Sequence, residues 1–257
     1  MNNDFRVIIL AAGRGKRLGS ETADRPKVMR EVAGKPLLGH VVDKITDIDK
    51  KNITIIAGYK KESVLEAFSD YSFAIQEEQK GTGHAVMCAE ENFRNYDGNV
   101  LILSGDMPLV SHDTLEKLCS FHAANGNSCS VLSVENKNES SFGRVIRNAD
   151  GNFCGIVEKK DCDSEQIKST ELNAGIYVFD SKLLFKYLHS INSNNAQGEY
   201  YITDVPALLI KNGYKVDAYK IYDLDETLGV NTLEDLALVE KVMAKRGHDC
   251  VVAAHAH

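Results

Sequence analysis

The chain has 257 residues, of which 43% are hydrophobic and 26% charged, and its formal net charge at pH 7 is −7. These values are ordinary for a globular protein with a well-filled core in one large or two modest domains, and the negative charge argues against non-specific binding to nucleic acid or anionic membranes. No apolar run approaches the roughly eighteen residues of a membrane span, and the opening Met-Asn-Asn-Asp-Phe-Arg is not a signal peptide, so we expect a cytoplasmic protein.

The first predicted strand ends in a glycine-rich basic loop. The apolar run 7–10 is typical of a buried parallel strand, and ligands of open α/β sheets bind beyond the carboxyl ends of such strands. Gly13 and Gly15 permit a tight turn that brings backbone N–H groups close to an anion. Three cations add full positive charge there: Arg14, Lys16 and Arg17. The loop therefore predicts a phosphate-binding site, although an ordinary strand-to-helix turn is the alternative for the glycines alone.

The spacing of this loop excludes two common phosphate-binding motifs. A Walker loop needs Ser or Thr after its Gly-Lys pair, whereas Lys16 is followed by Arg17. The dinucleotide fingerprint needs a third glycine where the chain has Leu18. The pattern that remains is G-x-G-x-R, and the guanidinium of Arg17 offers a fork of fixed donors that suits a triphosphate.

A further cation follows a short polar stretch. Pro26 fixes its own φ and favours an extended Arg25, so Lys27 leaves the backbone in a defined direction. We interpret Lys27 as a second cation for the same phosphates, and the alternative is a solvated surface lysine.

Strands and helices then alternate along the chain. Apolar spacing predicts helices over 37–45 and 62–69 and strands over 53–59 and 73–76. This alternation implies a mainly parallel sheet with right-handed crossovers.

Two glutamines lie three residues apart after the strand over 73–76. The side-chain amides of Gln76 and Gln79 both donate and accept hydrogen bonds, as is needed to read the paired edge of a base such as uracil. The pair therefore indicates a place for a nucleotide base.

A Gly-Thr-Gly sequence follows these glutamines and precedes a helix predicted over 85–92. Gly81 and Gly83 permit close approach, and Thr82 either caps the helix or touches a ligand. Helix capping alone is the alternative for this stretch, and we interpret His84 as structural rather than catalytic.

Another apolar strand, over 100–103, runs into Gly105 and Asp106. A carboxylate at the carboxyl end of a buried strand, on the same sheet edge as the basic loop, suits Mg²⁺. We expect Asp113 and Thr114 to begin the next helix, so Asp106 is not needed for that.

The second half of the chain continues in the same way. Helices are predicted over 114–124, over 181–191, from about 205 and from the cap at Thr232, and strands over 128–134, 172–179 and 216–221. A β-hairpin over 143–157 turns at 148–151 and leads to Glu158. The last helix is expected to end near Gly247, because glycine is the favoured stop, and we predict no regular structure for the last ten residues.

The remaining features indicate a single domain. The six cysteines have no C-x-x-C spacing, so we expect reduced and mostly buried thiols. There is no internal repeat and no low-complexity linker. We therefore expect one domain over 1–257, with an ordered core over about 5–245 and a frayed tail over 247–257 that contains His255 and His257.

Taken together, these stretches resemble one family. The motifs occur in the family's order: Leu10-Ala-Ala-Gly-x-Gly-x-Arg17, Pro26-Lys27, Gln76-x-x-Gln79-x-Gly81-Thr82-Gly83-His84-Ala85, Gly105-Asp106-x-Pro108-Leu109, Gly143-Arg144, Ile156-Val157-Glu158, the run 194–204 and Gly229-Val230-Asn231. The first motif alone resembles the wider class of sugar nucleotidyltransferases. The Asn-Ala-Gln-Gly-Glu-Tyr-Tyr-Ile-Thr-Asp run is more specific and resembles the N-acetylglucosamine-1-phosphate uridylyltransferase half of the bifunctional bacterial enzymes that make UDP-N-acetylglucosamine.

The resemblance implies a fold and a reaction. The fold would be a Rossmann-like α/β nucleotidyltransferase fold, a mainly parallel mixed sheet flanked by helices, with a small β-hairpin insertion on the sugar side. The reaction would join UTP and N-acetylglucosamine 1-phosphate to give UDP-N-acetylglucosamine and pyrophosphate. A sugar phosphate is largely dianionic at neutral pH, its second pKa being about 6, so no general base is required. The sequence offers no His–carboxylate or Ser–His set that would supply one.

The resemblance also implies residue roles. The uridine would be held by the backbone of Leu10, Ala11, Ala12 and Gly13 and by Gln76, Gln79, Gly81 and Thr82. Catalytic cations on the triphosphate would be Arg17 and Lys27. Mg²⁺, bridging the reacting phosphates, would be held by Asp106 and Asn231. The sugar would be lined by Gly143, Glu158, Asn173 and Thr203.

Three departures from the family pattern qualify these expectations. Ser104 stands where the family usually has Tyr, and Ala174 where it has Thr, so the exact sugar stays open. No hexapeptide repeat follows, so we expect no acetyltransferase activity, and no trimer is implied.

The alternatives are a nucleotidyltransferase for another sugar 1-phosphate or another nucleotide, such as glucose 1-phosphate or dTTP, and a non-catalytic sugar-nucleotide-binding domain. The expected partners are UTP and a sugar 1-phosphate, with no nucleic acid and no membrane, and the oligomeric state stays open.

Overall fold

The computed structural model describes residues 5–15, 18, 25–138 and 140–254, with 248–254 described by backbone alone. Within this part of the chain, nine strands form one sheet and two short strands form a separate hairpin. The strands of the sheet are β1 (Phe5–Ala11), β4 (Ile53–Ala57), β5 (Ser72–Ile75), β6 (Asn99–Ser104), β7 (Cys129–Glu135), β8 (Arg144–Arg147), β9 (Phe153–Val157), β10 (Glu171–Asp180) and β11 (Val216–Ile221). The separate hairpin pairs β2 (Glu31–Val32) with β3 (Lys35–Pro36).

The order of the sheet is β11-β7-β10-β6-β1-β4-β5, with the β8–β9 hairpin attached to β10. Strand β1 pairs in parallel with β4 and β6, and the pairs β4–β5 and β7–β11 are also parallel. Strand β10 runs antiparallel to both β6 and β7. The prediction of a mainly parallel mixed sheet with a hairpin insertion is therefore confirmed. Because β10 is reversed, its first residues lie at the edge where the parallel strands end.

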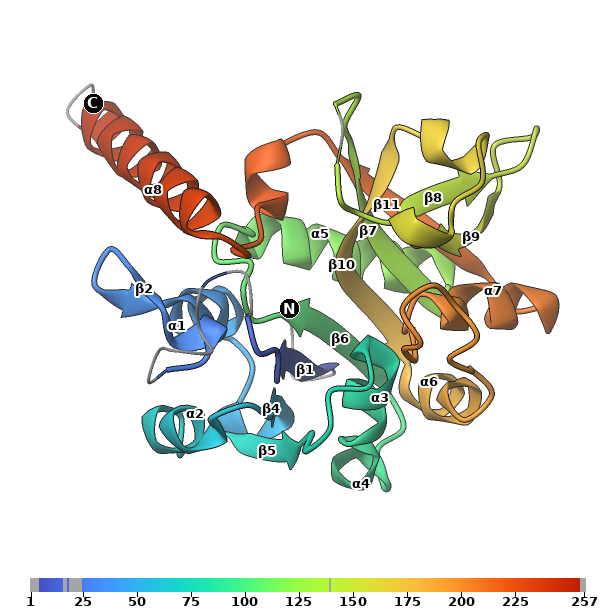
Figure 1. Cartoon of the computed structure of the whole chain (residues 1–257), viewed down its shortest axis with the longest axis horizontal. Helices are drawn as coiled ribbons and strands as arrows, with labels where there is room; N and C mark the ends of the chain where they lie inside the picture. The colour runs from blue at the N-terminus through green and yellow to red at the C-terminus, as the bar shows by residue number, and fades with distance from the viewer. Residues whose placement is uncertain (1–4, 16–17, 19–24, 139, 255–257) are drawn as a thin grey trace.

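Helices cover both faces of this sheet (Figure 1). The α-helices are α1 (Leu37–Val42), α2 (Lys61–Ala67), α3 (Thr82–Met87), α4 (Glu90–Phe93), α5 (His112–Asn125), α6 (Ser181–Leu188), α7 (Asp204–Lys211) and α8 (Leu233–Ala254). The short 3-10 helices are η2 (Lys27–Met29), η3 (Asp43–Ile45), η4 (Lys50–Asn52), η5 (Lys159–Asp161), η6 (Gln166–Lys168) and η7 (Leu224–Thr227). None of the helices in the described residues combines the length and the apolar character that a membrane span requires.

The core consists of two apolar layers separated by the sheet. Along β1, Val7 and Ile9 pack on the side of α1, α2 and α5, whereas Ile8 packs on the side of α3, α4, α6 and α7. All three side chains are fully buried. Both faces of a central parallel strand are covered in this way, which explains why its sequence is an unbroken apolar run.

Two predicted helix starts were displaced. Helix α5 begins at His112, and its cap is Ser111, whose side chain accepts a hydrogen bond from the Thr114 N–H at 3.1 Å. The predicted helix over 85–92 begins earlier, at Thr82, and is split into α3 and α4. Between them the hydrogen bonds span three residues, which is the spacing of a tighter turn.

The last helix is longer than predicted. It is capped as expected, since the Thr232 hydroxyl accepts from the Asp235 N–H at 3.1 Å, but it continues through Gly247 to Ala254. Gly247 does not adopt the left-handed conformation that ends a helix, and a helical glycine costs only about 1 kcal/mol. The predicted stop near Gly247 was therefore wrong, and so was the prediction of no regular structure for the last ten residues. Residues 255–257, with both tail histidines, lie outside the described part of the chain.

The cysteines are free where the structure describes their side chains. Cys119 and Cys129 are buried, Cys88 and Cys162 are half-buried, and Cys154 is exposed. The absence of disulfides among these residues agrees with the expected reduced thiols, but the expectation that most of them are buried was wrong.

Helix α3 is held close to the segment 199–202 by two glycines. A Cβ atom at Gly81 would come within 2.5 Å of the Tyr200 carbonyl oxygen, and one at Gly83 within 2.5 Å of a methyl carbon of Ile191. The Gly83 N–H donates to the Tyr200 carbonyl at 2.8 Å. The close approach predicted for these glycines is therefore made by the chain's own backbone.

We predict that Gly83→Ala lowers the free energy of unfolding by about 1–3 kcal/mol, because the added methyl group overpacks the contact with Ile191 and Tyr200. The matched control is Gly247→Ala, another helical glycine, where an added Cβ meets nothing within 4 Å. It should raise stability by up to about 1 kcal/mol. Urea unfolding followed by circular dichroism measures both changes, and a neutral or stabilising Gly83→Ala would contradict the packing described here.

Candidate functional site

A cleft lies over the edge where the parallel strands end, and it consists of two adjoining hollows. The first, of about 270 Å³, lies over β1, β5 and α3, and the second, of about 230 Å³, lies over β6, the start of β10 and the β8–β9 hairpin. Both are lined by Leu10, Thr82, Ser104 and Asp106, so the two hollows adjoin at these residues. We call the first the loop-side half and the second the hairpin-side half.

The structure brings nearly all the residues predicted for a site into this cleft. The loop-side half is lined by Leu10, Ala12, Gly13, Lys27, Gln76, Gln79, Gly81, Thr82 and Asp106. The hairpin-side half is lined by Gly143, Glu158, Asn173, Thr203 and Asn231, together with Leu10, Thr82 and Asp106. Two predicted residues are not among them. Ala11 points into the core on the other face of β1, so it offers only backbone groups, and Arg17 lies outside the described residues.

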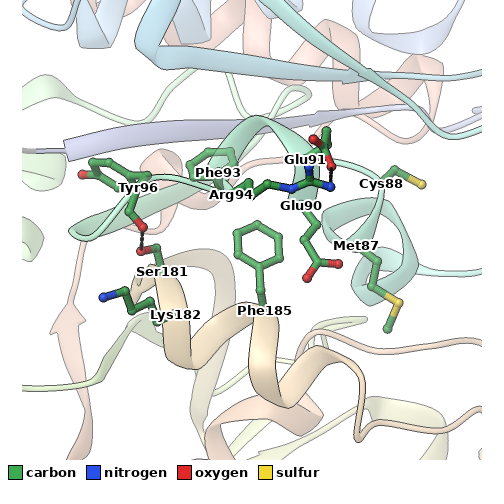
Figure 2. A pocket seen from close by; sticks show the side chains of 10 residues that line it. All are labelled: Met87, Cys88, Glu90, Glu91, Phe93, Arg94, Tyr96, Ser181, Lys182 and Phe185. Carbon is green, nitrogen blue, oxygen red and sulfur yellow. Dashed lines mark hydrogen bonds and ion pairs between the residues drawn. The ribbon is translucent and has the colours of Figure 1, made fainter.

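A larger cavity, of about 580 Å³, lies elsewhere, between α4 and α6 (Figure 2). Its polar groups already have partners: Arg94 pairs with Glu91 at 2.5 Å, and the Ser181 hydroxyl donates to the Tyr96 carbonyl at 3.1 Å. Glu90 and Lys182 pair with His189 and Asp97 outside the cavity. The cavity holds none of the predicted site residues. We therefore take the smaller cleft over the sheet edge as the functional site.

Gln76 is the most constrained polar residue of the loop-side half. Its side chain is only 3% exposed, and its amide nitrogen lies 3.0 Å from both the Gly81 carbonyl oxygen and His84 Nδ1. No donor in the described residues reaches its amide oxygen, and that atom is not enclosed by protein. Gln76 therefore presents a hydrogen-bond acceptor to the cleft.

Gln79 connects two loops at the rim of the cleft. Its amide oxygen accepts a hydrogen bond from Arg14 Nε at 2.8 Å, and its amide nitrogen donates to the Gln76 carbonyl at 3.2 Å. Arg14 belongs to the basic loop after β1. Both ends of the Gln79 amide are thus engaged within the protein, so its place is at the edge of the site.

Thr82 does not cap α3, because the capping position is Gly81. Its hydroxyl accepts from the Ile202 N–H at 3.2 Å, and Thr82 itself lines both halves of the cleft. The alternative that this stretch serves helix capping alone is therefore wrong.

Lys27 lies between two oxygen ligands at the junction of the halves. Its ammonium donates a short hydrogen bond to Asp106 Oδ2 and a second one, of 3.1 Å, to Asn231 Oδ1. The Lys27 side chain is 13% exposed and that of Asp106 is 18% exposed. Lys27 is therefore not the solvated surface lysine of the alternative interpretation, and the two oxygens converge on the place of one positive charge.

The backbone holds Asn231 beside Asp106. The Val230 N–H donates to the Asp106 carbonyl at 3.0 Å, which joins the loop after β6 to the start of α8. The Asp235 carboxylate accepts from the N–H groups of Asn231 and Thr232, both at 2.8 Å. The predicted cap of α8 therefore also fixes the position of Asn231.

Glu158 and Thr203 form the polar wall of the hairpin-side half. The Thr203 hydroxyl donates to Glu158 Oε1 at 3.0 Å. Burial raises the pKa of the Glu158 carboxyl, and the nearby carboxylates of Asp161, Asp204 and Glu199 raise it further, while the Thr203 hydrogen bond opposes them. A ligand that donates hydrogen bonds to the Glu158 carboxylate would therefore stabilise its charged form.

Asn173 is placed in the cleft by an irregularity in β10. The register with β7 shifts between Asn173 and Tyr177, and Gly175 within this bulge has a φ of +73°. The Asn173 amide nitrogen donates to the Tyr177 hydroxyl at 2.8 Å, and its amide oxygen accepts from the Gly175 N–H at 3.1 Å. Bulges of this kind re-aim side chains next to sites.

Several residues that line the cleft were assigned no role from the sequence, among them Glu199 and Phe142, and Ser104 was noted only as a departure from the family pattern. Ser104 lies at the junction of the halves, and its hydroxyl donates to the Gly175 carbonyl at 3.4 Å. Glu199 lines the loop-side half and Phe142 the hairpin-side half. Glu199 belongs to the run 194–204, and the resemblance of that run to the family was the sequence signal that could have indicated it. Phe142 directly precedes Gly143, which was predicted to line the sugar. Neither position carries a local pattern that marks it by itself.

Comparisons with known proteins agree with this arrangement. A family model described as nucleotidyl transferase matches residues 6–225. The curated relative "Bifunctional protein GlmU" of Streptococcus agalactiae serotype V is 45% identical over 241 residues, which is 93% of this chain and 52% of the relative. The protein of the same name from Clostridium acetobutylicum is 42% identical over 242 residues, again 93% of this chain and 52% of the relative. The chain thus spans about half the length of the curated relatives it matches.

Among solved structures, a UDP-glucose pyrophosphorylase complexed with UDP-glucose superposes with a TM-score of 0.74. The match covers 96% of this chain and 100% of the other, at 20% sequence identity. At that identity the likeness shows the fold alone, and it confirms the predicted Rossmann-like nucleotidyltransferase fold.

The raised pKa of Glu158 gives a prediction of stability against pH. The folded protein holds the Glu158 proton to higher pH than the unfolded chain does, so stability falls as pH rises from the ordinary carboxyl pKa of 4.5 to the raised one, and then levels off. Glu158→Gln keeps an acceptor for Thr203 but carries no charge. We therefore expect it to be more stable than the wild type at pH 7, with the gain vanishing as the pH falls below about 4. Urea unfolding at both pH values measures this, and a variant equally destabilised at both would contradict it.

Proposed function

Because the chain belongs to the nucleotidyl transferase family, we propose that its cleft transfers a uridylyl group from UTP to N-acetylglucosamine 1-phosphate, giving UDP-N-acetylglucosamine and pyrophosphate. The observation that supports this best is the position of Lys27, Asp106 and Asn231, which converge where the two halves of the cleft meet. When two phosphorylated substrates react, negative charge grows where their phosphates meet. The groups that neutralise this charge must therefore lie at the junction of the two halves.

In this proposal the loop-side half holds the uridine. The acceptor that Gln76 presents to the cleft suits the N3–H of uracil, which donates a hydrogen bond at the paired edge of the base. Gly13, Gly81 and Thr82 line the remaining walls. The base then lies against α3, with the phosphates toward Lys27.

The hairpin-side half holds the sugar. Sugar hydroxyl and acetamido N–H groups are donors, and the Glu158 carboxylate is an acceptor that the neighbouring carboxylates make more basic. Asn173 has one amide hydrogen left after its bond to Tyr177, and it is a second candidate for a sugar oxygen. Ser104 leaves room at the junction where the family usually has an aromatic ring.

The chemistry requires alignment and charge neutralisation. A phosphate oxygen of the sugar 1-phosphate attacks the α-phosphorus of UTP, and the bond from that phosphorus to the oxygen of the leaving pyrophosphate breaks. The attacking phosphate is already ionised, so no base removes a proton. Lys27 neutralises the charge that grows on the phosphates, and we propose the same for Arg17 on the leaving side.

The residues at the junction also fit a divalent cation, which we propose to be Mg²⁺. Mg²⁺ prefers oxygen ligands and keeps waters and substrate phosphates in most of its positions, so one carboxylate and one amide oxygen are a suitable protein contribution. Asp106 and Asn231 supply these two oxygens, and both already point to one cation, the Lys27 ammonium. Water and substrate phosphates would supply the remaining ligands. When bound, the ion neutralises and orients phosphate oxygens.

A substrate panel tests the proposal. Pyrophosphate release is measured with N-acetylglucosamine 1-phosphate, its galacto epimer and glucose 1-phosphate at fixed UTP, and then with other nucleoside triphosphates. We expect the highest kcat/KM for UTP with N-acetylglucosamine 1-phosphate. A preference for another sugar or nucleotide would replace that assignment within the same class. No release with any pair would support the non-catalytic alternative and overturn the enzyme.

Asp106→Asn tests the junction. The variant keeps an oxygen that can accept from Lys27 but loses the charge, so we expect it to fold normally and to lose about a hundred- to thousandfold in kcat/KM with Mg²⁺. The matched control is Asp43→Asn, because Asp43 pairs with Lys35 on the surface, away from the cleft. Its turnover should be unchanged. An Asp106→Asn enzyme within about threefold of the wild type would remove Asp106 from the proposed metal site.

A further inference from the structure

We propose that Lys27 and a divalent cation compete for the oxygens of Asp106 and Asn231, and that the phosphates of a bound nucleotide end this competition by drawing the Lys27 ammonium away. The inference rests on the proposed function, in which those two oxygens are metal ligands and Lys27 neutralises phosphate charge. It adds that the metal binds weakly to the protein alone and tightly together with the nucleotide.

The Lys27 ammonium engages both oxygens at once. It donates a short hydrogen bond to Asp106 Oδ2 and a hydrogen bond of 3.1 Å to Asn231 Oδ1. Within the residues that the structure describes, no other donor reaches the Asp106 carboxylate or the Asn231 amide oxygen. A metal ion that binds these oxygens therefore has to take the place that the ammonium holds.

Two cations on these ligands repel each other strongly. Asp106 has a second carboxylate oxygen, but the Asn231 side chain has only one oxygen, so an ion held by both residues shares that atom with Lys27. Mg²⁺ lies about 2.0–2.1 Å from its oxygens, which brings it close to the ammonium. The Lys27 and Asp106 side chains are only 13% and 18% exposed, so little water screens this repulsion. The ammonium and the metal therefore exclude each other.

The Lys27 ammonium can move while its backbone stays fixed. Lys27 begins η2, in which the Met29 N–H donates to the Pro26 carbonyl at 3.0 Å and Val28 and Met29 are buried. The stem of the lysine has four carbons with free rotation about their bonds. Lys27 also lines the loop-side half, in which the nucleotide is proposed to lie. Phosphate oxygens placed there offer the ammonium other acceptors.

The metal and the nucleotide therefore favour each other's binding. Transfer of the ammonium to the phosphates frees Asp106 and Asn231 for the metal, and a metal on these oxygens leaves the ammonium to the phosphates. Such coupling is reciprocal by thermodynamic linkage. A variant without the ammonium should consequently bind the metal more tightly, not less tightly, when no nucleotide is present.

The test measures binding of Mn²⁺, which takes the same oxygen ligands as Mg²⁺ and whose free ion is followed by electron paramagnetic resonance. The proteins are the wild type, Lys27→Gln, Lys27→Met, Lys27→Arg and the double variant Lys27→Gln/Asp106→Asn. Gln and Met are neutral, and Gln keeps a donor for the Asp106 carboxylate, whereas Arg keeps the positive charge. The matched control is Lys35→Gln, because Lys35 pairs with Asp43 on the surface, away from the cleft. Circular dichroism verifies that each variant is folded.

Without nucleotide, we expect Lys27→Gln and Lys27→Met to bind Mn²⁺ at least about tenfold more tightly than the wild type, because the competing charge is gone. Lys27→Arg and Lys35→Gln should stay within about threefold of the wild type. The double variant should lose the gain, since the Asp106 carboxylate on which it depends is absent.

With the Mn²⁺ complex of UTP as the ligand, and with no sugar phosphate, the effect should change sign. The two neutral variants should bind this complex about threefold or more weakly than the wild type, because the phosphates have lost the Lys27 ammonium. Equilibrium dialysis with labelled UTP measures this binding without turnover.

Neutral variants that bind Mn²⁺ alone no more tightly than the wild type would overturn the inference, since the ammonium and the metal would then not compete. Tighter binding of both ligands would also contradict it, because the phosphates would not take up Lys27. A wild type that releases no pyrophosphate, in a series that shows the change of sign, would contradict the proposed reaction alone. An active, metal-dependent enzyme whose variants show no change of sign would contradict the inference alone.

Discussion

The structure of the cleft depends on one half-buried charge arrangement, the Lys27 ammonium between the oxygens of Asp106 and Asn231. These residues are separated from Lys27 by 79 and 204 positions in the sequence, and their hydrogen bonds join the segment after the basic loop, the end of β6 and the start of α8. Both members of the Lys27–Asp106 pair are largely shielded from water. The Lys27 ammonium thus keeps together the two oxygens that we propose as metal ligands.

The sheet brings the rest of the site to the same place. Strand β1 lies between β4 and β6, all three parallel, so the loops that follow them meet at one edge. The reversed strand β10 then brings Asn173 to that edge from the other direction, and the bulge at Gly175 turns it toward the cleft. The two halves of the cleft therefore reflect the two strand directions. One half is built on the ends of parallel strands, and the other on the start of an antiparallel strand and its attached hairpin.

The sequence predicted the elements well where their pattern is local. Fully buried strands such as β1 and β6 read as unbroken apolar runs, and the turn at 148–151 marks the hairpin directly. Helix boundaries were less accurate, because Ser111 and Asp113 are equally good caps and the choice between them depends on where the chain leaves β6. Gly247 was read as a stop because sequence does not reveal whether a glycine will adopt a left-handed conformation. For the site, only the resemblance to a family indicated Asn231 and Thr203, because no spacing argument connects residues so far apart; both line the cleft, and their roles stay predictions.

We propose that the two adjoining halves of the cleft bind the two substrates in a defined direction. A crystal structure with UDP-N-acetylglucosamine and Mg²⁺ tests it most directly. We expect the uracil against Gln76 and the sugar against Glu158 and Asn173. The diphosphate should lie between them beside Lys27, with the metal on Asp106 and Asn231. A ligand in the opposite direction, or one bound instead in the cavity between α4 and α6, would contradict it.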